Sequence, residues 1–296
     1  MQIIDGRSLA LKIRQSLKVN IAKNPTKPDL AIILVGDDQA SQTYVRLKEE
    51  AAEEIGMHFQ KFVFANTASQ AEIIQTVQKI NQDPKIHGLI VQLPLPKHLN
   101  ADQIIFAIDP KKDADGFHPK NLEKFRDNTA AFAPVLCEGI WRLIDSVNQD
   151  LTGKKAVILA NSTIFAEPMA ILLTRQDLDT TIVYSPFKDF ETQTKAAGVV
   201  VIAIGQSNFL KNHHIKSWAI LIDVGFNRDG KKVVGDIDFE SVKNSTGWIT
   251  PVPGGVGPMT VAMLVQRVYE LSLKIWKTSE ISSKALFDSA RAAAPD

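Results

Sequence analysis

Short runs of Ile, Leu, Val and Ala alternate along most of this 296-residue chain with segments whose apolar residues recur at helical spacing. Runs that are almost continuous in aliphatic residues are typical of parallel strands covered by helices on both faces. The pattern predicts strands at 31–35, 88–92, 155–159, 181–183, 199–204 and 220–224. Strands that alternate with helices favour an α/β fold with doubly wound, mostly parallel sheets.

The length of the chain allows two domains with separate cores. The segment 119–153 carries charges and a proline between the two sets of strands, so we expect the crossing between domains there. We predict an N-terminal domain at 1–119 and a Rossmann-like domain at 120–259. A C-terminal helix from about 260 to 296 is expected to pack back on the first domain. Its Ser/Ala-rich part, 278–296, forms a loosely attached helix or frays.

Charge and cysteine content narrow the class of protein. The chain has 34 basic and 33 acidic residues and a net charge of +1, which argues against a nucleic-acid or membrane surface and favours small-molecule chemistry. Cys137 is the one cysteine, so no intramolecular disulfide is possible and a reducing compartment fits. The N-terminus does not resemble a signal peptide, and no apolar run is long enough to span a membrane. We therefore expect a soluble cytoplasmic protein.

A loop rich in proline and glycine, Thr250–Thr260, precedes an apolar helical pattern. Prolines stiffen such a segment, and glycines let backbone N–H groups approach a flat or anionic ligand. The positive end of the following helix would face the same place. A rigid hinge between domains explains the composition equally well, so composition alone leaves both interpretations open.

Tyr44 and Lys48 are four residues apart in a predicted helix, 41–55, that ends at Gly56. They therefore share one face of this helix. A half-buried tyrosine beside a solvated lysine is the ordinary interpretation. If Lys48 is instead desolvated near the end of strand 88–92, burial lowers its pKa and allows it to transfer protons.

Other polar residues give weaker signals. Asp113 and Asp115 stand before Gly116, as acidic residues of an ordinary turn often do. His118, His213 and His214 do not have the spacing of metal ligands, so we expect no metal site. Cys137 has no neighbour that marks it as a nucleophile.

Several long motifs together resemble the bifunctional methylenetetrahydrofolate dehydrogenase/methenyltetrahydrofolate cyclohydrolase family. They are Gly88–Pro96, Lys112–Pro119, the 250–260 loop, and the pair Tyr44 and Lys48. The resemblance extends from Ile4-Asp5-Gly6 to about Tyr269. It implies two α/β domains with a folate cleft between them, a cytoplasmic homodimer, and a role in one-carbon metabolism such as purine biosynthesis.

The resemblance also implies roles for individual residues. Tyr44 would stack on the pterin or aminobenzoyl system, and Lys48 would be the acid/base of the cyclohydrolase step, tuned by Gln92. Asp115 would hydrogen-bond the amino-pyrimidine edge, a bidentate task suited to a carboxylate, while Asp113 keeps its role in the turn. The loop residues that would border the substrate are Pro253, Gly254 and Gly255.

The cofactor region departs from the family. A dinucleotide fingerprint needs glycines after its first strand, but the turn 160–167 has none, and we expect the next helix to begin at Pro168. The family usually has Gly-Arg-Ser at 160–162 and glycine at 166. NADP is the implied cofactor, with low affinity because Asn161 carries no charge for the extra phosphate. The expected cofactor-binding residues are Ala160, Asn161, Ser162, Ser185, Lys188 and Gly225.

The implied reaction is NADP-dependent oxidation of 5,10-methylenetetrahydrofolate to the methenyl form, followed by hydrolysis to 10-formyltetrahydrofolate. One alternative is a cyclohydrolase with weakened or lost dehydrogenase activity. Another is a non-catalytic folate-binding paralogue, which the presence of Lys48 disfavours. A dehydrogenase for an unrelated substrate is disfavoured by the missing glycine fingerprint.

Overall fold

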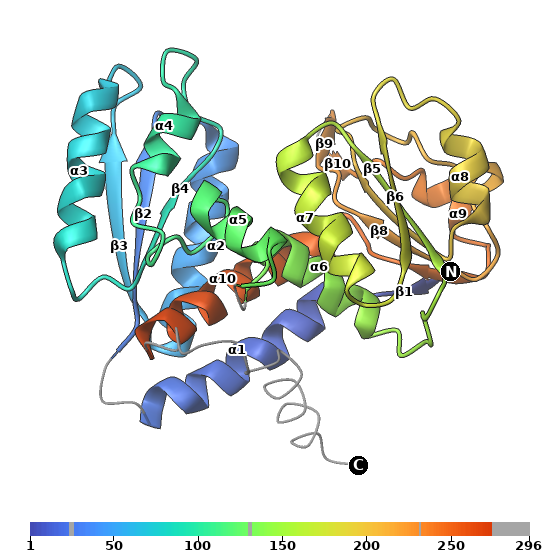
Figure 1. Cartoon of the computed structure of the whole chain (residues 1–296), viewed down its shortest axis with the longest axis horizontal. Coiled ribbons are helices and arrows are strands. Elements are labelled where there is room, and N and C mark those ends of the chain that lie inside the picture. The colour runs from blue at the N-terminus through green and yellow to red at the C-terminus, as the bar shows by residue number, and fades with distance from the viewer. Residues whose placement is uncertain (24–26, 130–131, 231, 274–296) are drawn as a thin grey trace. The chain divides into compact units, whose positions relative to one another are not determined.

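The computed structural model describes residues 1–23, 27–129, 132–230 and 232–273 (Figure 1). They form two compact units, each built around its own sheet. The three-stranded unit contains Leu11–Val135 and the described residues from Val261 onward. The six-stranded unit contains Met1–Ala10 and Leu136–Thr260. The segment 278–296, expected to be a loose helix or to fray, lies outside the described residues.

The three-stranded unit has a parallel sheet in the order β3-β2-β4. Its strands are β2 (Asp29–Val35), β3 (His58–Phe64) and β4 (Gly88–Val91). All seven residues of β2 are buried, because successive side chains of this central strand point to opposite faces and helices cover both.

Each face of this sheet has its own core. On one face, Leu30, Ile32 and Leu34 pack with buried residues of three helices. These helices are α1 (Gly6–Lys23), α2 (Gln39–Ile55) and α10 (Val256–Ser272). On the other face, Ala31, Ile33 and Val35 pack with residues of α3 (Gln70–Gln82) and α4 (Ala101–Phe106). Figure 1 shows α3 lying along this sheet. A further helix of the unit, α5, spans Pro119–Arg126.

Local signals fix the ends of the helix that carries Tyr44 and Lys48. The Asp38 side chain accepts a hydrogen bond from Ser41 N at the start of α2, and Gly56 ends the helix with φ 78°, a conformation that suits glycine. The helix predicted over 41–55 is thus confirmed, with two further residues at its N-terminus.

The six-stranded unit has a parallel sheet in the order β1-β11-β8-β7-β5-β6. Its strands are β1 (Gln2–Ile3), β5 (Lys155–Ala160), β6 (Asp179–Tyr184), β7 (Val199–Ala203), β8 (Ala219–Asp223) and β11 (Gly247–Ile249). The chain reverses its direction of travel across the sheet at β5, which lies between β6 and β7. In open α/β sheets such a switch point marks the ligand site, at the carboxyl ends of the strands.

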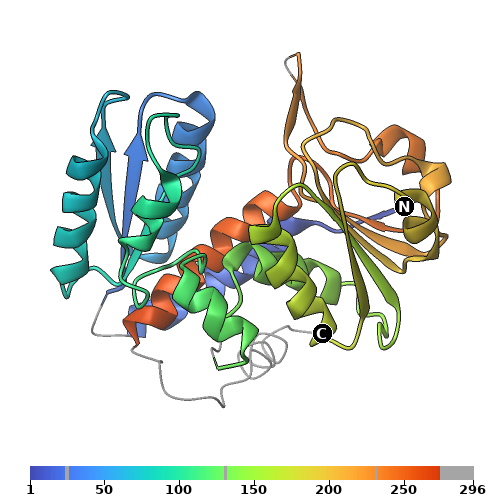
Figure 2. The same cartoon turned by 45° about the horizontal axis from the view of Figure 1, so that its top comes forward.

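Helices and a hairpin complete this unit. The helices are α6 (Val135–Asp145), α7 (Thr163–Thr174), α8 (Phe190–Ala196), the 3₁₀ helix η1 (Asn212–His214) and α9 (Phe239–Val242). The antiparallel strands β9 (Asn227–Asp229) and β10 (Lys232–Val234) form the orange hairpin that extends from the unit in Figure 2. Among the described residues, no helix has the length and apolar character needed to cross a membrane.

The predicted α/β fold with mostly parallel sheets is confirmed, and all six predicted strands are present with ends shifted by at most two residues. The start predicted for the helix after β5 is wrong. α7 begins at Thr163, and Pro168 lies inside it. Ser162 has the extended backbone of an N-cap position, with φ −124° and ψ 124°, so the helix starts almost directly after the strand.

Candidate active site

The carboxyl end of the three-stranded sheet brings Lys48 and Gln92 together. α2 follows β2, and Gln92 follows the neighbouring strand β4, so both lie at the same end of adjacent strands. Lys48 Nζ donates a hydrogen bond to Gln92 Oε1 over 2.9 Å. Gln92 Nε2 donates to Leu93 O over 2.6 Å, which orients the amide so that its oxygen faces the lysine. Tyr44 lies one turn before Lys48, and both side chains are half-buried.

Asp115 reaches the same end of the sheet because its segment runs alongside β4. Leu89 N donates to Lys112 O over 2.7 Å, and Leu89 and Asp113 form a parallel bridge. Counting forward in this register, Asp115 lies level with the end of β4, where Gln92 follows. Three residues predicted for the substrate site from separate motifs, Lys48, Gln92 and Asp115, are thus gathered in one place.

Asp113 holds the turn that carries Asp115. Its carboxylate accepts hydrogen bonds from Gly116 N (3.0 Å), His118 N (2.8 Å) and Asn121 Nδ2 (2.9 Å). Gly116 has φ 81°, a conformation that side chains rarely adopt, so the turn requires glycine there. The structural role predicted for Asp113 is confirmed by these contacts.

Burial changes the acidity of both charged residues at this site. Burial lowers the pKa of Lys48, and the negative charge of Asp115 partly opposes that shift. Burial raises the pKa of Asp115, Lys48 opposes the rise, Asp113 adds to it and Arg267 opposes it. The pair therefore combines a lysine that loses its proton more easily than usual with a carboxyl group that burial makes harder to ionise, an effect that Lys48 and Arg267 partly offset. A lysine with a lowered pKa is suited to general acid–base chemistry.

The Gly/Pro loop belongs to the six-stranded unit. A Cβ placed on Gly6 would lie 2.0 Å from Gly255 O, so the Ile4-Asp5-Gly6 motif packs directly against this loop. A Cβ on Gly255 would lie 2.6 Å from Thr250 Cβ, and Gly254 has φ 120°. Close packing thus explains Gly255, and the positive φ explains Gly254. The substrate contacts of Gly254, Gly255 and Pro253 stay predictions.

The turn after β5 consists of Asn161 and Ser162, followed at once by α7. Residues 161–164 are exposed, and the first N–H groups of a helix have no partner within it. Asn161 Nδ2 donates to Ile204 O over 2.6 Å, which joins the loops after β5 and β7 at the switch point. The free N–H groups at the start of α7 suit a dinucleotide pyrophosphate. The side-chain amide of Asn161, by contrast, is hydrogen-bonded within the protein. Ala160 and Ala166 are fully buried.

Two buried carboxylates organise the neighbouring loops. Asp223 accepts hydrogen bonds from the backbone N–H groups of Gly225, Asp236 and Ile237, each over 2.9 Å. Asp236 in turn accepts from the N–H groups of residues 204–206 and from Asn227 Nδ2. A Cβ on Gly225 would lie 2.4 Å from Asp236 Cγ, so packing alone explains this glycine. Its predicted contact with the cofactor remains a prediction.

Ser185 and Lys188 follow β6, whose last residue is Tyr184. Both are exposed, and the segment between them includes Phe187 in the left-handed region with φ 54°. The two residues therefore lie at the carboxyl end of the sheet, as a cofactor contact requires. Their cofactor-binding roles stay predictions.

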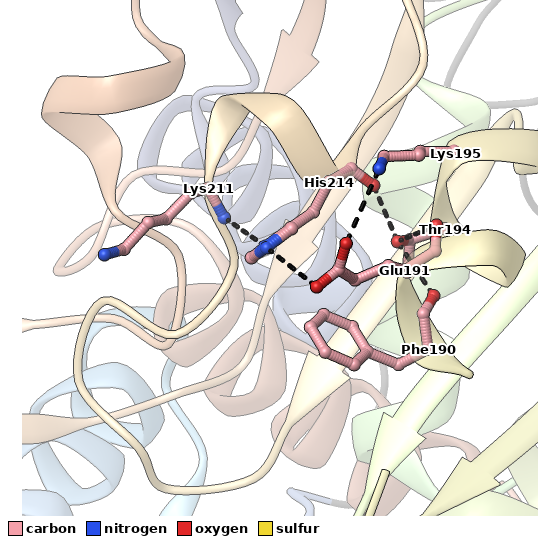
Figure 3. A network of polar contacts seen from close by, with 6 residues as sticks. All are labelled: Phe190, Glu191, Thr194, Lys195, Lys211 and His214. Carbon is pink, nitrogen blue, oxygen red and sulfur yellow. Dashed lines mark hydrogen bonds and ion pairs between the residues drawn. The ribbon is translucent and has the colours of Figure 1, made fainter. Parts of the chain in front are cut away.

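The histidines have structural contacts. His214 is buried; its backbone oxygen accepts a hydrogen bond of 2.6 Å from Thr194 Oγ1, and its Nδ1 accepts one from Lys211 N. Figure 3 shows the Glu191 carboxylate between Lys195 and His214, so the network fastens α8 to η1. His118 caps α5 by accepting from Lys120 N over 3.1 Å. The described part of the chain contains no group of three or more potential metal ligands.

Arg267 is a residue of this site that the sequence interpretation missed. It lies on α10, is 3% exposed, and affects the charge of Asp115. The available signal was a single arginine within the apolar helical pattern that follows the Gly/Pro loop.

Comparison with known proteins identifies relatives of both units. The catalytic-domain model of the tetrahydrofolate dehydrogenase/cyclohydrolase family matches residues 4–115, and its NAD(P)-binding-domain model matches residues 134–275. Bifunctional protein FolD of Listeria innocua is 42% identical over 280 residues, which cover 93% of this chain and 99% of that protein. Its namesake from Streptococcus pyogenes is 45% identical over 278 residues, covering 92% and 98%.

Solved structures give the same result. The bifunctional FolD methylenetetrahydrofolate dehydrogenase/cyclohydrolase of Campylobacter jejuni superposes with a TM-score of 0.89 at 38% identity, covering 93% of this chain and 99% of that one. The Trypanosoma brucei enzyme, solved as a complex with NADP cofactor and an inhibitor, has a TM-score of 0.88 at 32% identity, covering 93% and 98%.

Proposed function

The chain belongs to the tetrahydrofolate dehydrogenase/cyclohydrolase family, and from this premise we propose that it is a bifunctional enzyme of folate one-carbon metabolism. It oxidises 5,10-methylenetetrahydrofolate to 5,10-methenyltetrahydrofolate and hydrolyses that product to 10-formyltetrahydrofolate. The observation that carries the proposal is the hydrogen bond of 2.9 Å from Lys48 to Gln92 at the end of the sheet where Asp115 also lies.

Asp115 and Tyr44 bind the substrate in this proposal. The Asp115 carboxylate accepts hydrogen bonds from the N–H donors of the amino-pyrimidine edge, and such charge-assisted bonds are stronger than neutral ones. Asp113 fixes the turn so that Asp115 meets the substrate in one orientation. Tyr44 stacks on the pterin or aminobenzoyl ring, one helical turn from Lys48.

Lys48 transfers protons in the hydrolysis step. A water molecule adds to the methenyl carbon, and the bond from this carbon to one ring nitrogen breaks, which leaves the formyl group. Lys48 takes one proton from the attacking water and passes it to the leaving nitrogen, and the second proton of the water goes to solvent as the formyl C=O forms, because the methenyl group starts as a cation. Burial favours the neutral amine that the first of these transfers needs. Gln92 holds the amine in place through its oriented oxygen.

The oxidation step requires a nicotinamide dinucleotide, and residues at the switch point of the six-stranded sheet fit it. NADP accepts the hydride from the substrate when it is bound. The exposed N-terminus of α7 would hold the pyrophosphate, and Asn161, Ser162, Ser185 and Lys188 lie on the loops beside it. Binding of NADP is weak in this proposal, because no cation stands at position 161 to pair with the extra phosphate.

Substitution of Lys48 by methionine tests the proposed chemistry. This change removes the amine but keeps an unbranched side chain of nearly the same length, and loss of acid–base help should slow methenyltetrahydrofolate hydrolysis on the order of 10²–10⁴-fold. Folate binding should remain measurable in a direct titration. Hydrolysis by Lys48→Met at the rate of the unmodified protein would show that Lys48 is not the proton-transfer residue.

Arg46→Met is the matched control for this experiment. Arg46 is also a cation of α2, but its side chain is 64% exposed and forms a surface ion pair with Glu50. Exposed pairs of this kind contribute little to stability. The control variant should therefore hydrolyse the substrate at the rate of the unmodified protein.

A homodimer and a cytoplasmic location complete the proposal. The family resemblance supports both, and the lone cysteine agrees with a reducing compartment. Light scattering on the purified protein should give a mass of about twice 32.6 kDa. A mass equal to that of one chain would refute the dimer without affecting the proposed chemistry.

A further inference from the structure

Arg267 is a charged residue buried in the three-stranded unit, with 3% of its surface exposed. Its neighbours in α10, Val265 and Val268, are fully buried members of the core of this unit. A buried guanidinium is costly unless it is paired and hydrogen-bonded. Arg267 Nη2 donates to Ala133 O over 2.8 Å, and Nε lies 3.7 Å from Glu270 Oε2. These contacts hold the charged group in one position.

The guanidinium also lies beside the turn that carries Asp115. A Cβ placed on Gly116, the residue after Asp115, would lie 3.5 Å from Arg267 Nη1 and 3.0 Å from Pro134 Cα. Val135 N donates to Asp115 O over 3.1 Å. The guanidinium carbon stands 4.3 Å from the centre of the Phe132 ring. Arg267, the 132–135 segment and the Asp115 turn therefore form one packed cluster.

Two cations and one further anion influence the Asp115 carboxylate. Lys48 approaches it from α2 and Arg267 from α10, and both favour its ionised form. Asp113, on the same segment as Asp115, favours the protonated form. Glu270 lies one helical turn after Arg267 in α10, and its carboxylate partly neutralises the guanidinium. Loss of the Arg267 charge would leave Asp115 with Lys48 as its one strong cationic neighbour in this set.

We propose that Arg267 is a positioning residue for substrate binding, which holds Asp115 as the acceptor for the amino-pyrimidine edge through the 132–135 segment and through its own positive charge. This role depends on the folate-binding function proposed for Asp115. Burial raises the pKa of Asp115, and Arg267 counteracts that rise. Without Arg267, Asp115 therefore takes up a proton at a higher pH and then loses one of its acceptor sites.

The test compares Arg267→Met with Arg267→Lys in the full-length protein. For Arg267→Met we expect KM for methenyltetrahydrofolate hydrolysis to rise about tenfold, as for one lost charge-assisted contact, with kcat within about twofold. The pH below which KM rises should also move upward. Arg267→Lys keeps the charge and should restore the pH dependence towards that of the unmodified protein. An unchanged KM and an unchanged pH dependence in Arg267→Met would overturn the inference.

A double substitution separates positioning from general damage. If Arg267 acts through Asp115, adding Arg267→Met to Asp115→Asn should raise KM little further, because the interaction is already lost. Independent, multiplied effects in the double variant would overturn the inference. If Asp115→Asn alone leaves KM unchanged, the proposed function of Asp115 fails instead, and the two failures are distinguishable.

Two additional variants guard against misfolding. Arg267→Met combined with Glu270→Gln removes both buried charges, so Glu270 is not left without a compensating cation. KM should rise in this double variant as much as in Arg267→Met alone. Arg14→Met removes another arginine of this unit, which is paired with Glu54 over 2.7 Å. It should leave KM unchanged, and a comparable rise there would overturn the specific role of Arg267.

Discussion

The acidity of Lys48 depends on what stands at position 92. Gln92 Oε1 accepts a hydrogen bond from Lys48 Nζ, and Gln92 Nε2 is already used on Leu93 O. The amide therefore presents a neutral acceptor to a lysine whose pKa burial lowers. A neutral partner leaves this lowered pKa largely in place, whereas a carboxylate would oppose it.

Two substitutions of Gln92 should shift the pH–rate profile of hydrolysis in opposite directions. Gln92→Glu places a negative charge beside Lys48, raises its pKa, and should move the acid limb upward by about one pH unit. Gln92→Leu removes the acceptor, destabilises the ammonium, and should move the acid limb downward. The measurement is kcat for methenyltetrahydrofolate hydrolysis between pH 5 and 9. Shifts of the same sign in both variants would show that the limb does not report Lys48.

Cys137 illustrates a residue whose chemistry the fold suppresses. It is fully buried in α6, and burial raises the pKa of its thiol because the thiolate loses its hydration. An aromatic disulfide reagent should not react with the folded protein and should titrate one thiol once the chain is unfolded in guanidinium. Rapid reaction in the folded state would contradict the buried position.

At the scale of elements, continuous apolar runs were enough to predict six strands, including β5, whose residues from Ala156 onward are all buried. β3 was not predicted, because it is an edge strand whose exposed and half-buried residues interrupt the apolar run. Proline favours the first turn of a helix, so the sequence predicts that α7 begins at Pro168. In the structure α7 begins at Thr163, and Pro168 lies in the second turn, where a proline costs one backbone hydrogen bond.

The corrected position of α7 changes the expectation for the cofactor turn. Ala166 is buried in the helix, so glycine there would cost roughly 1 kcal/mol of stability rather than open the turn. The remaining deficit is Asn161, which is neutral and donates to Ile204 O.

Asn161→Arg should therefore improve NADP affinity by itself. A charge-assisted contact with the extra phosphate contributes ~1.5–3 kcal/mol, or roughly one to two decades of affinity. Calorimetry with NADP and NAD measures the change, and Asn161→Ala is the control that removes the bond to Ile204 without adding charge. The rate of hydrolysis should stay the same, because Lys48, Gln92 and Asp115 belong to the other unit. Micromolar NADP binding by the unmodified chain would refute the expected weakness.

At the scale of the whole molecule, sequence motifs predicted which residues lie together but not what surrounds them. Lys48, Gln92 and Asp115 came from separate motifs, and parallel pairing along β2 and β4 brings them to one end of a sheet. Arg267 was not predicted as a site residue, because its role depends on its contact with the 132–135 segment. No local sequence pattern encodes that contact. Likewise, β1 adds a strand of only two residues to the six-stranded sheet. So short a run has no sequence pattern by which a strand could be predicted.

Asp223 should make the stability of the six-stranded unit depend on pH. Burial raises the pKa of this carboxyl from 3.8 to about 7, although three backbone N–H groups oppose the rise. Between about pH 4 and 7 the folded chain then holds a proton that the unfolded chain has released. The stabilisation that comes from this difference is complete below the unfolded pKa and is lost as pH rises through 7.

Lowering the pH from 8 to 5 should therefore stabilise the unmodified protein relative to Asp223→Asn by roughly 3 kcal/mol, since the proton difference persists over about two pH units, between pH 7 and 5, and each contributes about 1.4 kcal/mol. Tryptophan fluorescence during denaturation is a suitable measurement, because Trp141, Trp218 and Trp248 belong to this unit.

Part of the loss of stability in Asp223→Asn should be independent of pH, because the amide nitrogen of asparagine cannot accept the N–H of Ile237. This constant loss adds to the pH-dependent difference. The exposed Asp179 provides the control, and Asp179→Asn should follow the unmodified protein. If the difference between Asp223→Asn and the unmodified protein is the same at pH 5 and pH 8, Asp223 is ionised throughout this range, and its hydrogen bonds outweigh its burial.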